Sequence, residues 1–169
     1  KSHVTIEGAG ADVTEIDGAA SDRVFDIFAS FQVDIQSVAI QNGNAENGAG
    51  QDLSDGGGIR NAGQLALDAV IVDNNRTGYY EANGGGIYNI GTLTVNNSTL
   101  SNNSSKYFGS VYGAGGAIAN NGVLTINDST LKHNEAAGGG GGLLIHYGAS
   151  TSLTNVTLRE NESYAGGGG

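Results

Sequence analysis

Three histidines and seventeen carboxylates are the side chains of this 169-residue sequence that are best suited to chemistry. His3, His133 and His146 lie in different parts of the sequence, so we expect exposed or corner positions and no shared metal site. A glycosidase needs two carboxyl groups about 5–9.5 Å apart. The paired-aspartate and Gly-His-Gly motifs of pectin-type hydrolases are missing, and we therefore predict that the chain is not an enzyme.

Aromatic side chains gather in the segments that interrupt a repeated pattern. Insertions on one side of a repeat protein often build its binding face, and aromatic rings suit sugars and partner surfaces. The favoured interpretation is that these rings fold back over their own loops, and the other interpretation is a glycan- or partner-binding site. The residues of this candidate site are Tyr79, Tyr80, Glu81, Tyr107, Phe108 and Tyr112, and Tyr164 lies in a shorter segment of the same kind.

Calcium is the one cofactor that the sequence leaves open. Asp52 and Asp55, with nearby carbonyl groups, offer the oxygen ligands that Ca²⁺ takes. The known glycine- and aspartate-rich calcium-binding repeat is absent from the sequence. The glycine run at 138–142 is followed by no Gly-Lys-Ser/Thr motif, which argues against a phosphate loop. We expect no other cofactor.

A repeat organises the chain between these segments. Its clearest copies are GGGIRNAGQLALDAVIVDNN (56–75), GGGIYNIGTLTVNNSTLSNN (84–103) and GGAIANNGVLTINDSTLKHN (115–134). A copy with one extra residue covers 141–161, and a degenerate copy covers 25–44. Such internal similarity is typical of solenoid architectures.

Each copy contains three short pieces in which apolar and polar residues alternate, as expected for strands with one buried face. In the third clear copy the predicted inward residues are Ile118, Leu124, Ile126 and Leu131, and the outward ones are Ala119, Thr125, Thr130 and Lys132. In the first strand of successive copies we align Ile59, Ile87, Ile118 and Leu144, followed by the outward residues Arg60, Tyr88, Ala119 and Ile145.

These patterns predict an all-β fold, a right-handed parallel β-helix with three short strands per coil. We expect five to six coils of about 26–32 residues in a single segment, 1–169. The approximate coils are 1–24, 25–55, 56–83, 84–114, 115–140 and 141–165, and 166–169 begins another. A leucine-rich repeat is the competing fold, but its consensus spacing is not met and no piece has helical periodicity.

An asparagine recurs at one phase of the repeat, three residues after the last inward apolar residue. Inward-turned asparagines can bond the backbone of their own corner, and stacked amides can bond each other. We therefore predict a structural ladder at Asn75, Asn103, Asn134 and Asn161. The adjacent glycines allow positive φ and close approach between coils.

Charge and hydrophobicity limit the classes of partner that the chain can bind. The net charge of −10 and only seven basic residues argue against nucleic acid, because a phosphate backbone is bound by Lys and Arg. No run of 18 apolar residues is present, so we expect no membrane span. The expected partners are other coils or domains of the same parent chain, neighbouring protein subunits, and glycans.

The repeated GG-x-I…LT-[IV]-NNST-[LV]-SNN pattern resembles the right-handed β-helix repeat proteins of bacteria and is similar to repeats of polymorphic outer-membrane adhesins. The resemblance covers essentially the whole chain and implies export to the cell surface or the extracellular matrix. It favours a non-catalytic module that serves as adhesin stalk, matrix component or partner-binding scaffold. The alternative is a fragment of a polysaccharide-active β-helix lyase or hydrolase whose catalytic coils lie elsewhere.

Both ends of the sequence fall within the repeat. Lys1 leads almost directly into a strand-like piece, and Gly166–Gly169 begin a new coil. Repeat proteins cap their terminal coils. We therefore expect the parent chain to extend in both directions, or a neighbouring subunit to cover each end.

Overall fold

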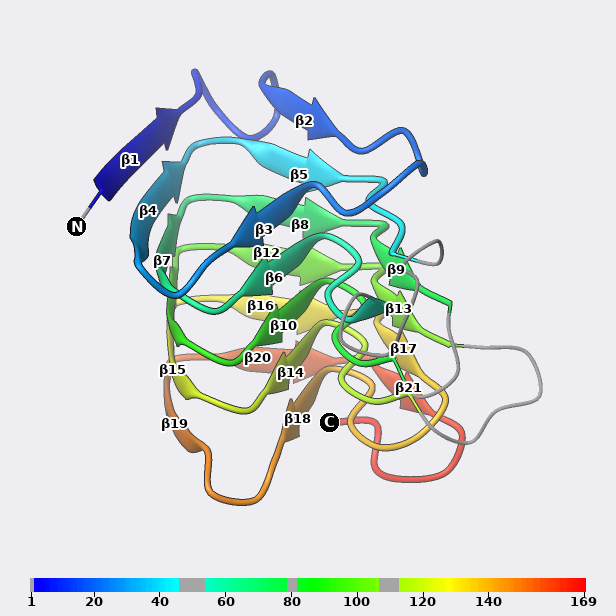
Figure 1. Cartoon of the computed structure of the whole chain (residues 1–169). Coiled ribbons are helices and arrows are strands. Elements are labelled where there is room, and N and C mark those ends of the chain that lie inside the picture. The colour runs from blue at the N-terminus through cyan, green and yellow to red at the C-terminus, as the bar shows by residue number, and fades with distance from the viewer. Residues whose placement is uncertain (1, 46–53, 79–81, 107–112) are drawn as a thin grey trace.

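The computed structural model describes residues 2–45, 54–78, 82–106 and 113–169. Its strands are all parallel and wind into a β-solenoid of about five turns (Figure 1). The predicted all-β, parallel β-helix class is therefore confirmed. Each full turn passes through four sheets, which we number first to fourth in chain order within a turn.

The first sheet is formed by short strands rich in Ile and Leu. Its members are β3 (Phe25–Ile27), β6 (Ile59–Asn61), β10 (Ile87–Asn89), β14 (Ile118–Asn120) and β18 (Leu143–Ile145). The second sheet has the longest strands, and they show the clearest alternation. Its members are β1 (Ser2–Glu7), β4 (Phe31–Gln36), β7 (Gln64–Asp68), β11 (Thr92–Asn96), β15 (Val123–Asn127) and β19 (Ser150–Thr154).

The third sheet follows after a corner at which one residue per turn has positive φ. Its members are β2 (Glu15–Asp17), β5 (Ala39–Gln41), β8 (Ile71–Asp73), β12 (Thr99–Ser101), β16 (Thr130–Lys132) and β20 (Thr157–Arg159). The corner residues are Ser37, Ala69, Asn97, Asp128 and Asn155, with φ between 49° and 57°.

A fourth sheet of two-residue strands was not part of the prediction. It comprises β9 (Arg76–Thr77), β13 (Ser104–Ser105), β17 (Glu135–Ala136) and β21 (Glu162–Ser163). These residues open the segments that the sequence had assigned to insertions. They pair because the asparagine corner just before them repeats in register, although their serines and charges gave no β signal.

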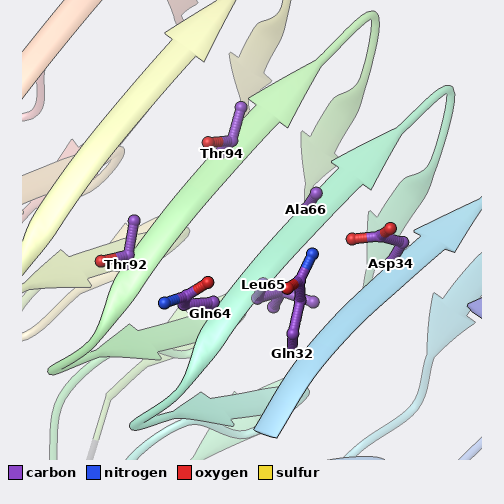
Figure 2. Close-up of a pocket in the computed structure, with 7 residues that line it drawn as sticks. All are labelled: Gln32, Asp34, Gln64, Leu65, Ala66, Thr92 and Thr94. Atoms are coloured by element: carbon purple, nitrogen blue, oxygen red, sulfur yellow. The ribbon is translucent and has the colours of Figure 1, made fainter. Parts of the chain in front are cut away.

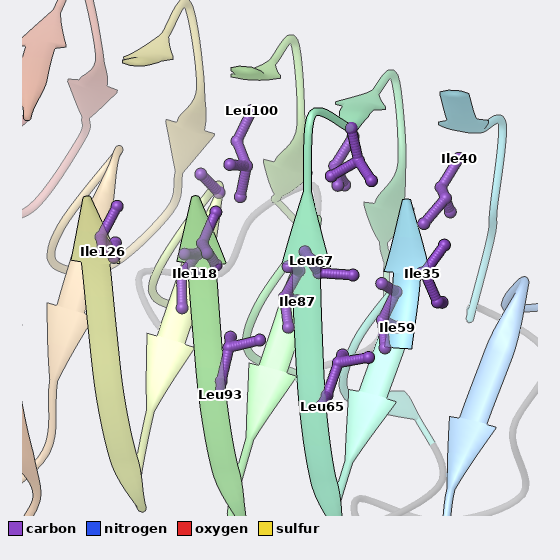
Figure 3. Packing of buried hydrophobic residues seen from close by; sticks show 14 of the residues in the cluster. Ile35, Ile40, Ile59, Leu65, Leu67, Ile87, Leu93, Leu100, Ile118 and Ile126 are labelled. Carbon is purple, nitrogen blue, oxygen red and sulfur yellow. The ribbon is translucent and has the colours of Figure 1, made fainter. Parts of the chain in front are cut away.

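One apolar column fills the solenoid (Figure 3). The predicted inward residues Ile118, Leu124, Ile126 and Leu131 are at most 1% exposed. Thr125, Thr130 and Lys132 alternate with them on the outer side and are partly exposed. Ala119 also alternates with buried neighbours but is itself 0% exposed, so the outer side of the first sheet is covered at this point.

The predicted alignment of the last coil is wrong by one residue. Ile118 pairs with Leu143, Ala119 with Leu144, and Asn120 with Ile145. The cause is the following corner, where His146, Tyr147, Gly148 and Ala149 stand in place of the two residues Asn121 and Gly122 of the preceding coil. The insertion therefore has two extra residues, and the outward stack of the first sheet ends in Leu144 instead of Ile145.

The glycines at the start of each turn have two roles. The first glycine of a turn adopts positive φ, as at Gly84 (φ 69°) and Gly115 (φ 70°). The next glycine lies against the backbone of an adjoining strand, so that a Cβ on Gly116 would overlap the carbonyl oxygens of Gly141 and Glu135. Only glycine fits both demands.

Candidate functional site

The second sheet has the longest strands of the described residues, and its outer face is regular. Alternate residues of its strands point outward while their neighbours enter the core, and parallel pairing lines them up in three rows. From β1 to β19 the rows are His3, Gln32, Gln64, Thr92, Val123 and Ser150; Thr5, Asp34, Ala66, Thr94, Thr125 and Ser152; and Glu7, Gln36, Asp68, Asn96, Asn127 and Thr154.

A hollow of about 180 Å³ opens on this face over β4, β7 and β11 (Figure 2). It exists because Ala66, in the middle row, lies between the larger Asp34 and Thr94. The lining residues are Gln32, Asp34, Gln64, Leu65, Ala66, Thr92 and Thr94. The walls are therefore amide, hydroxyl and carboxylate groups, and the methyl group of Ala66 lies between them.

Asp34 is held in place by a neighbouring coil. His3 Nε2 lies 2.8 Å from Asp34 Oδ2, and the pair becomes a salt bridge when His3 is protonated. The two side chains are 49% and 38% exposed, so their pairing contributes little to the free energy of unfolding. The contact with His3 instead orients the carboxylate of Asp34 at the rim of the hollow.

Two carboxylates of this face lie on neighbouring strands but not in the same row. Asp34 pairs with Ala66, whereas Asp68 pairs with Gln36. Asp68 is also engaged, since Asn97 Nδ2 donates to its Oδ1 at 2.8 Å. The described part of the second sheet therefore places an amide or a methyl group, and no second acid, directly beside each of these acids.

A second charged cluster lies on the outer side of the first sheet. Arg23 Nη1 is 3.7 Å from Asp26 Oδ2, and Arg60 Nη1 is 3.4 Å from Asp26 Oδ1. Burial lowers the pKa of Arg23, and the carboxylate of Asp26 opposes that shift. Because Asp26 and Arg60 are paired residues of β3 and β6, this cluster holds two successive coils together.

Most residues of the predicted aromatic site lie outside the described residues. These are Tyr79, Tyr80, Glu81, Tyr107, Phe108 and Tyr112. Tyr164 is described and 61% exposed, and its hydroxyl lies 2.8 Å from Lys106 Nζ. This hydrogen bond raises the pKa of Lys106, which also approaches Glu135 to 3.4 Å. The arrangement joins Lys106 to the next two coils.

Only one of the two calcium candidates can be placed. Asp52 lies outside the described residues, and Asp55 is 6% exposed. Asp55 Oδ1 accepts a hydrogen bond from Asn83 N at 2.5 Å, and Asn83 Oδ1 in turn accepts one from Ala114 N at 3.1 Å. This relay links three successive turns. No group of three His, Asp or Glu side chains is arranged for a metal ion within the described ranges.

The asparagines predicted to form a ladder lie one above another and are hydrogen-bonded. Asn75 Nδ2 donates to Asn103 Oδ1 at 3.0 Å, Asn103 Nδ2 to Asn134 Oδ1 at 3.0 Å, and Asn134 Nδ2 to Asn161 Oδ1 at 2.9 Å. Each oxygen also accepts the backbone N–H of the preceding asparagine. The first three are completely buried, and they satisfy the corner backbone from within.

A second buried ladder was missed at the sequence level. Asn61 Nδ2 donates to Asn89 Oδ1 at 2.8 Å, and Asn89 Nδ2 donates to Asn120 Oδ1 at 2.7 Å. The signal was an asparagine two residues after the first inward isoleucine of each turn. In the last coil this position is Ile145, and Asn120 Nδ2 turns to Thr151 Oγ1 at 3.0 Å instead.

Comparison with known proteins adds no relative. No family model, curated protein or solved structure matches the chain. The fold therefore rests on the structure itself. The bacterial source, the export and the adhesin-like class stay predictions from the repeat motif.

The three histidines lie apart, in separate surroundings. His3 is on the second sheet, and His133 Nε2 lies 3.0 Å from Glu160 Oε2. Burial lowers the pKa of His146, whose Nε2 atom is buried and has no hydrogen-bond partner among the described residues. Within the same residues, the structure contains no helix that is long and apolar enough to span a membrane.

Proposed function

We propose that this chain is a non-catalytic extracellular β-helix module of a bacterial protein, acting as an adhesin stalk, matrix component or partner-binding scaffold. The observation that supports the proposal is that inward and outward polar side chains have different roles. Those inside the solenoid hold successive coils together through the two asparagine ladders. Those on the second sheet form a regular outer face.

The inward polar groups support a structural role. A buried amide that lost its partners would cost about 1–3 kcal/mol, so a ladder that satisfies every rung also fixes the register of the coils. Ladder rungs recur at the same phase in successive turns. A solenoid built in this way is a stiff spacer whose length grows by about 4.8 Å per coil.

The outer carboxylates support binding over catalysis. Retaining and inverting glycosidases place two carboxyl groups across one scissile bond. Asp34 and Asp68 occupy different rows, and Asp68 is bonded to Asn97. The contacts of Asp34 with His3 and of Asp68 with Asn97 tie both acids to neighbouring coils, which suits the recognition of hydroxyl groups more than acid–base chemistry.

A turnover assay tests this function. The purified chain is incubated with neutral and uronic-acid polysaccharides, and reducing ends and unsaturated products are measured over time. We expect no product above a buffer blank. Product formation that disappears in Asp34→Asn or Asp68→Asn would overturn the scaffold assignment and favour a polysaccharide-active enzyme.

A further inference from the structure

We propose that the hollow over Ala66 is a binding subsite for a neutral polyhydroxylated ligand, a sugar unit of an uncharged glycan. The inference deepens the proposed scaffold role and rests on it, because an enzyme would turn over the ligand that a scaffold only holds. It is carried by the polar side chains that line this one hollow of the second sheet; Figure 2 shows the residues that surround it.

The walls of the hollow keep their hydrogen-bonding capacity. Among the described residues, the side chains of Gln32, Gln64, Thr92 and Thr94 have no hydrogen-bond partner, and Asp34 uses only Oδ2, toward His3. Two amides, two hydroxyls and one carboxylate oxygen therefore remain available to a ligand. Together they offer donors as well as acceptors.

The third row of the same face behaves differently. Asn127 Nδ2 donates to Asn96 Oδ1 at 2.9 Å, and Asn97 Nδ2 donates to Asp68 Oδ1 at 2.8 Å. Those side chains satisfy each other, as the buried ladders do. Other outward polar side chains of this face, among them Thr125 and Ser152, also lack a side-chain partner among the described residues. The hollow differs from them because the small Ala66 lets five outward polar side chains line one depression.

The chemistry of the lining selects the ligand class. Sugar hydroxyls donate and accept at once, which matches neighbouring amides and a carboxylate. The methyl group of Ala66 offers a small apolar contact for a C–H face of the ring. A polyanion is disfavoured by Asp34 and by the net charge of −10. The lining has no aromatic ring, and its one large aliphatic side chain, Leu65, is only 3% exposed, so an apolar ligand is not favoured.

The direction of the hollow suggests how a polymer lies. The lining crosses β4, β7 and β11, which are successive strands about 4.8 Å apart along the solenoid axis. A glycan that follows the axis meets Thr125 and Ser152 next in the middle row. Because no aromatic ring stacks on the ligand, a single unit should bind with a Kd on the order of 1 mM, and affinity should rise with chain length.

The test is an amide-resolved NMR titration of the purified chain. The probes are neutral β-1,4-glucan, β-1,4-mannan and β-1,3-glucan hexasaccharides, with an oligogalacturonate of the same length as the anionic probe. We expect shifts at residues 32–34, 64–66 and 92–94 with at least one neutral probe, extending to 125 and 152 when the ligand follows the axis, and none with the anion. Product peaks in the same tube report on turnover, so failure of the scaffold role is seen separately from failure of binding.

Three variants make the test specific. Ala66→Leu fills the hollow and should weaken binding more than tenfold, while Asp34→Asn, which keeps the shape, should weaken it about tenfold. Thr130→Leu adds the same side chain to the outer side of the third sheet, away from the rows of the second sheet, and should bind like the parent. Thermal unfolding of each variant verifies the fold. No response to any neutral probe, or equal binding by a folded Ala66→Leu variant, would overturn the proposal.

Discussion

The central and terminal coils share one repeat, but their inward side chains differ in how deeply they are buried. In β15 of a central coil, Leu124 and Ile126 are 1% and 0% exposed. In the next strand of the same column, β19, Leu153 pairs with Ile126 yet is 43% exposed. Position within a coil therefore does not bury a side chain. An inward side chain is buried only when a coil packs on each side of it, because each repeat of a solenoid is stabilised by its nearest neighbours.

The two ends expose the column in different ways. At the first coil, an open hollow of about 300 Å³ is lined by apolar side chains that include Val4, Phe28 and Phe31. Phe28 is 60% exposed there. At the last coil, which also has the enlarged corner at 146–149, Leu153 and Leu158 are exposed. The central coils are closed and the ends are open, so equal substitutions should have unequal effects.

A charge in the column gives the largest expected difference. Ile126→Asp places a carboxylate among fully buried apolar side chains and should lower the free energy of unfolding by more than about 4 kcal/mol, enough to unfold the chain. Leu153→Asp, at the neighbouring position of the column, should cost less than half as much. Urea denaturation followed by circular dichroism measures both. Equal losses would contradict the dependence on neighbouring coils.

Removal of a ladder rung should have the next largest effect. Asn103→Ala leaves Asn75 N–H, Asn75 Nδ2 and the Val72 carbonyl without their partner, at about 1–3 kcal/mol for a buried unsatisfied group. Asn161→Ala removes the equivalent side chain in the last coil, where water can replace it. We expect a smaller loss there in the same denaturation assay. A rung that could be deleted at Asn103 without loss would show that the ladder does not hold the coils together.

The same contrast explains what sequence reasoning could reach. Period-2 alternation identified the column residues, and a recurring asparagine marked the ladder of Asn103, because both signals repeat at one phase. Ala119 was predicted to point outward, and it is nevertheless 0% exposed. Alternation indicates the direction of a side chain but not whether other residues cover it. The sequence alignment placed Leu144 beside Ile118, whereas Leu143 is the residue that pairs there. The prediction was wrong because a corner insertion shifts the phase of the repeat without any change in the apolar pattern.

The candidate site was harder to predict than the fold. The hollow depends on Ala66 being smaller than Asp34 and Thr94, which come from adjacent turns of chain and become neighbours only through the register. In the sequence these three residues lie far apart, and none of them alone indicates a hollow. The aromatic segments offered a stronger composition signal, but most of their residues lie outside the described ranges.

Stacking of two copies would make the end coils resemble the central ones. In the third sheet, Leu158 and Arg159 of β20 occupy the positions that Ile16 and Asp17 hold in β2. A second copy that continues the register would bury Leu158 against Ile16 and bring Arg159 beside Asp17. We expect concentration-dependent association in sedimentation velocity. Arg159→Glu should weaken it several-fold, whereas Lys132→Glu, one coil inward in the same row, should not. A monomer at all concentrations would contradict this.

The smallest expected effect is a pH dependence confined to the enlarged corner of the last coil. Burial lowers the pKa of His146 in the folded chain, whereas the unfolded imidazole titrates near about 6.5. Above that pH both states are neutral at this site, so His146 does not affect the free energy of unfolding. As the pH falls below it, the unfolded chain takes up the proton first, and stability declines until the folded pKa is passed.

His146→Gln should therefore lose less stability than the parent between pH 7.5 and pH 5 in urea denaturation. The parent and the variant share every other titratable group, so the difference between them reports on His146 alone. Parallel stability curves would show that the imidazole is solvated in solution, and the corner would then be open like the rest of the last coil.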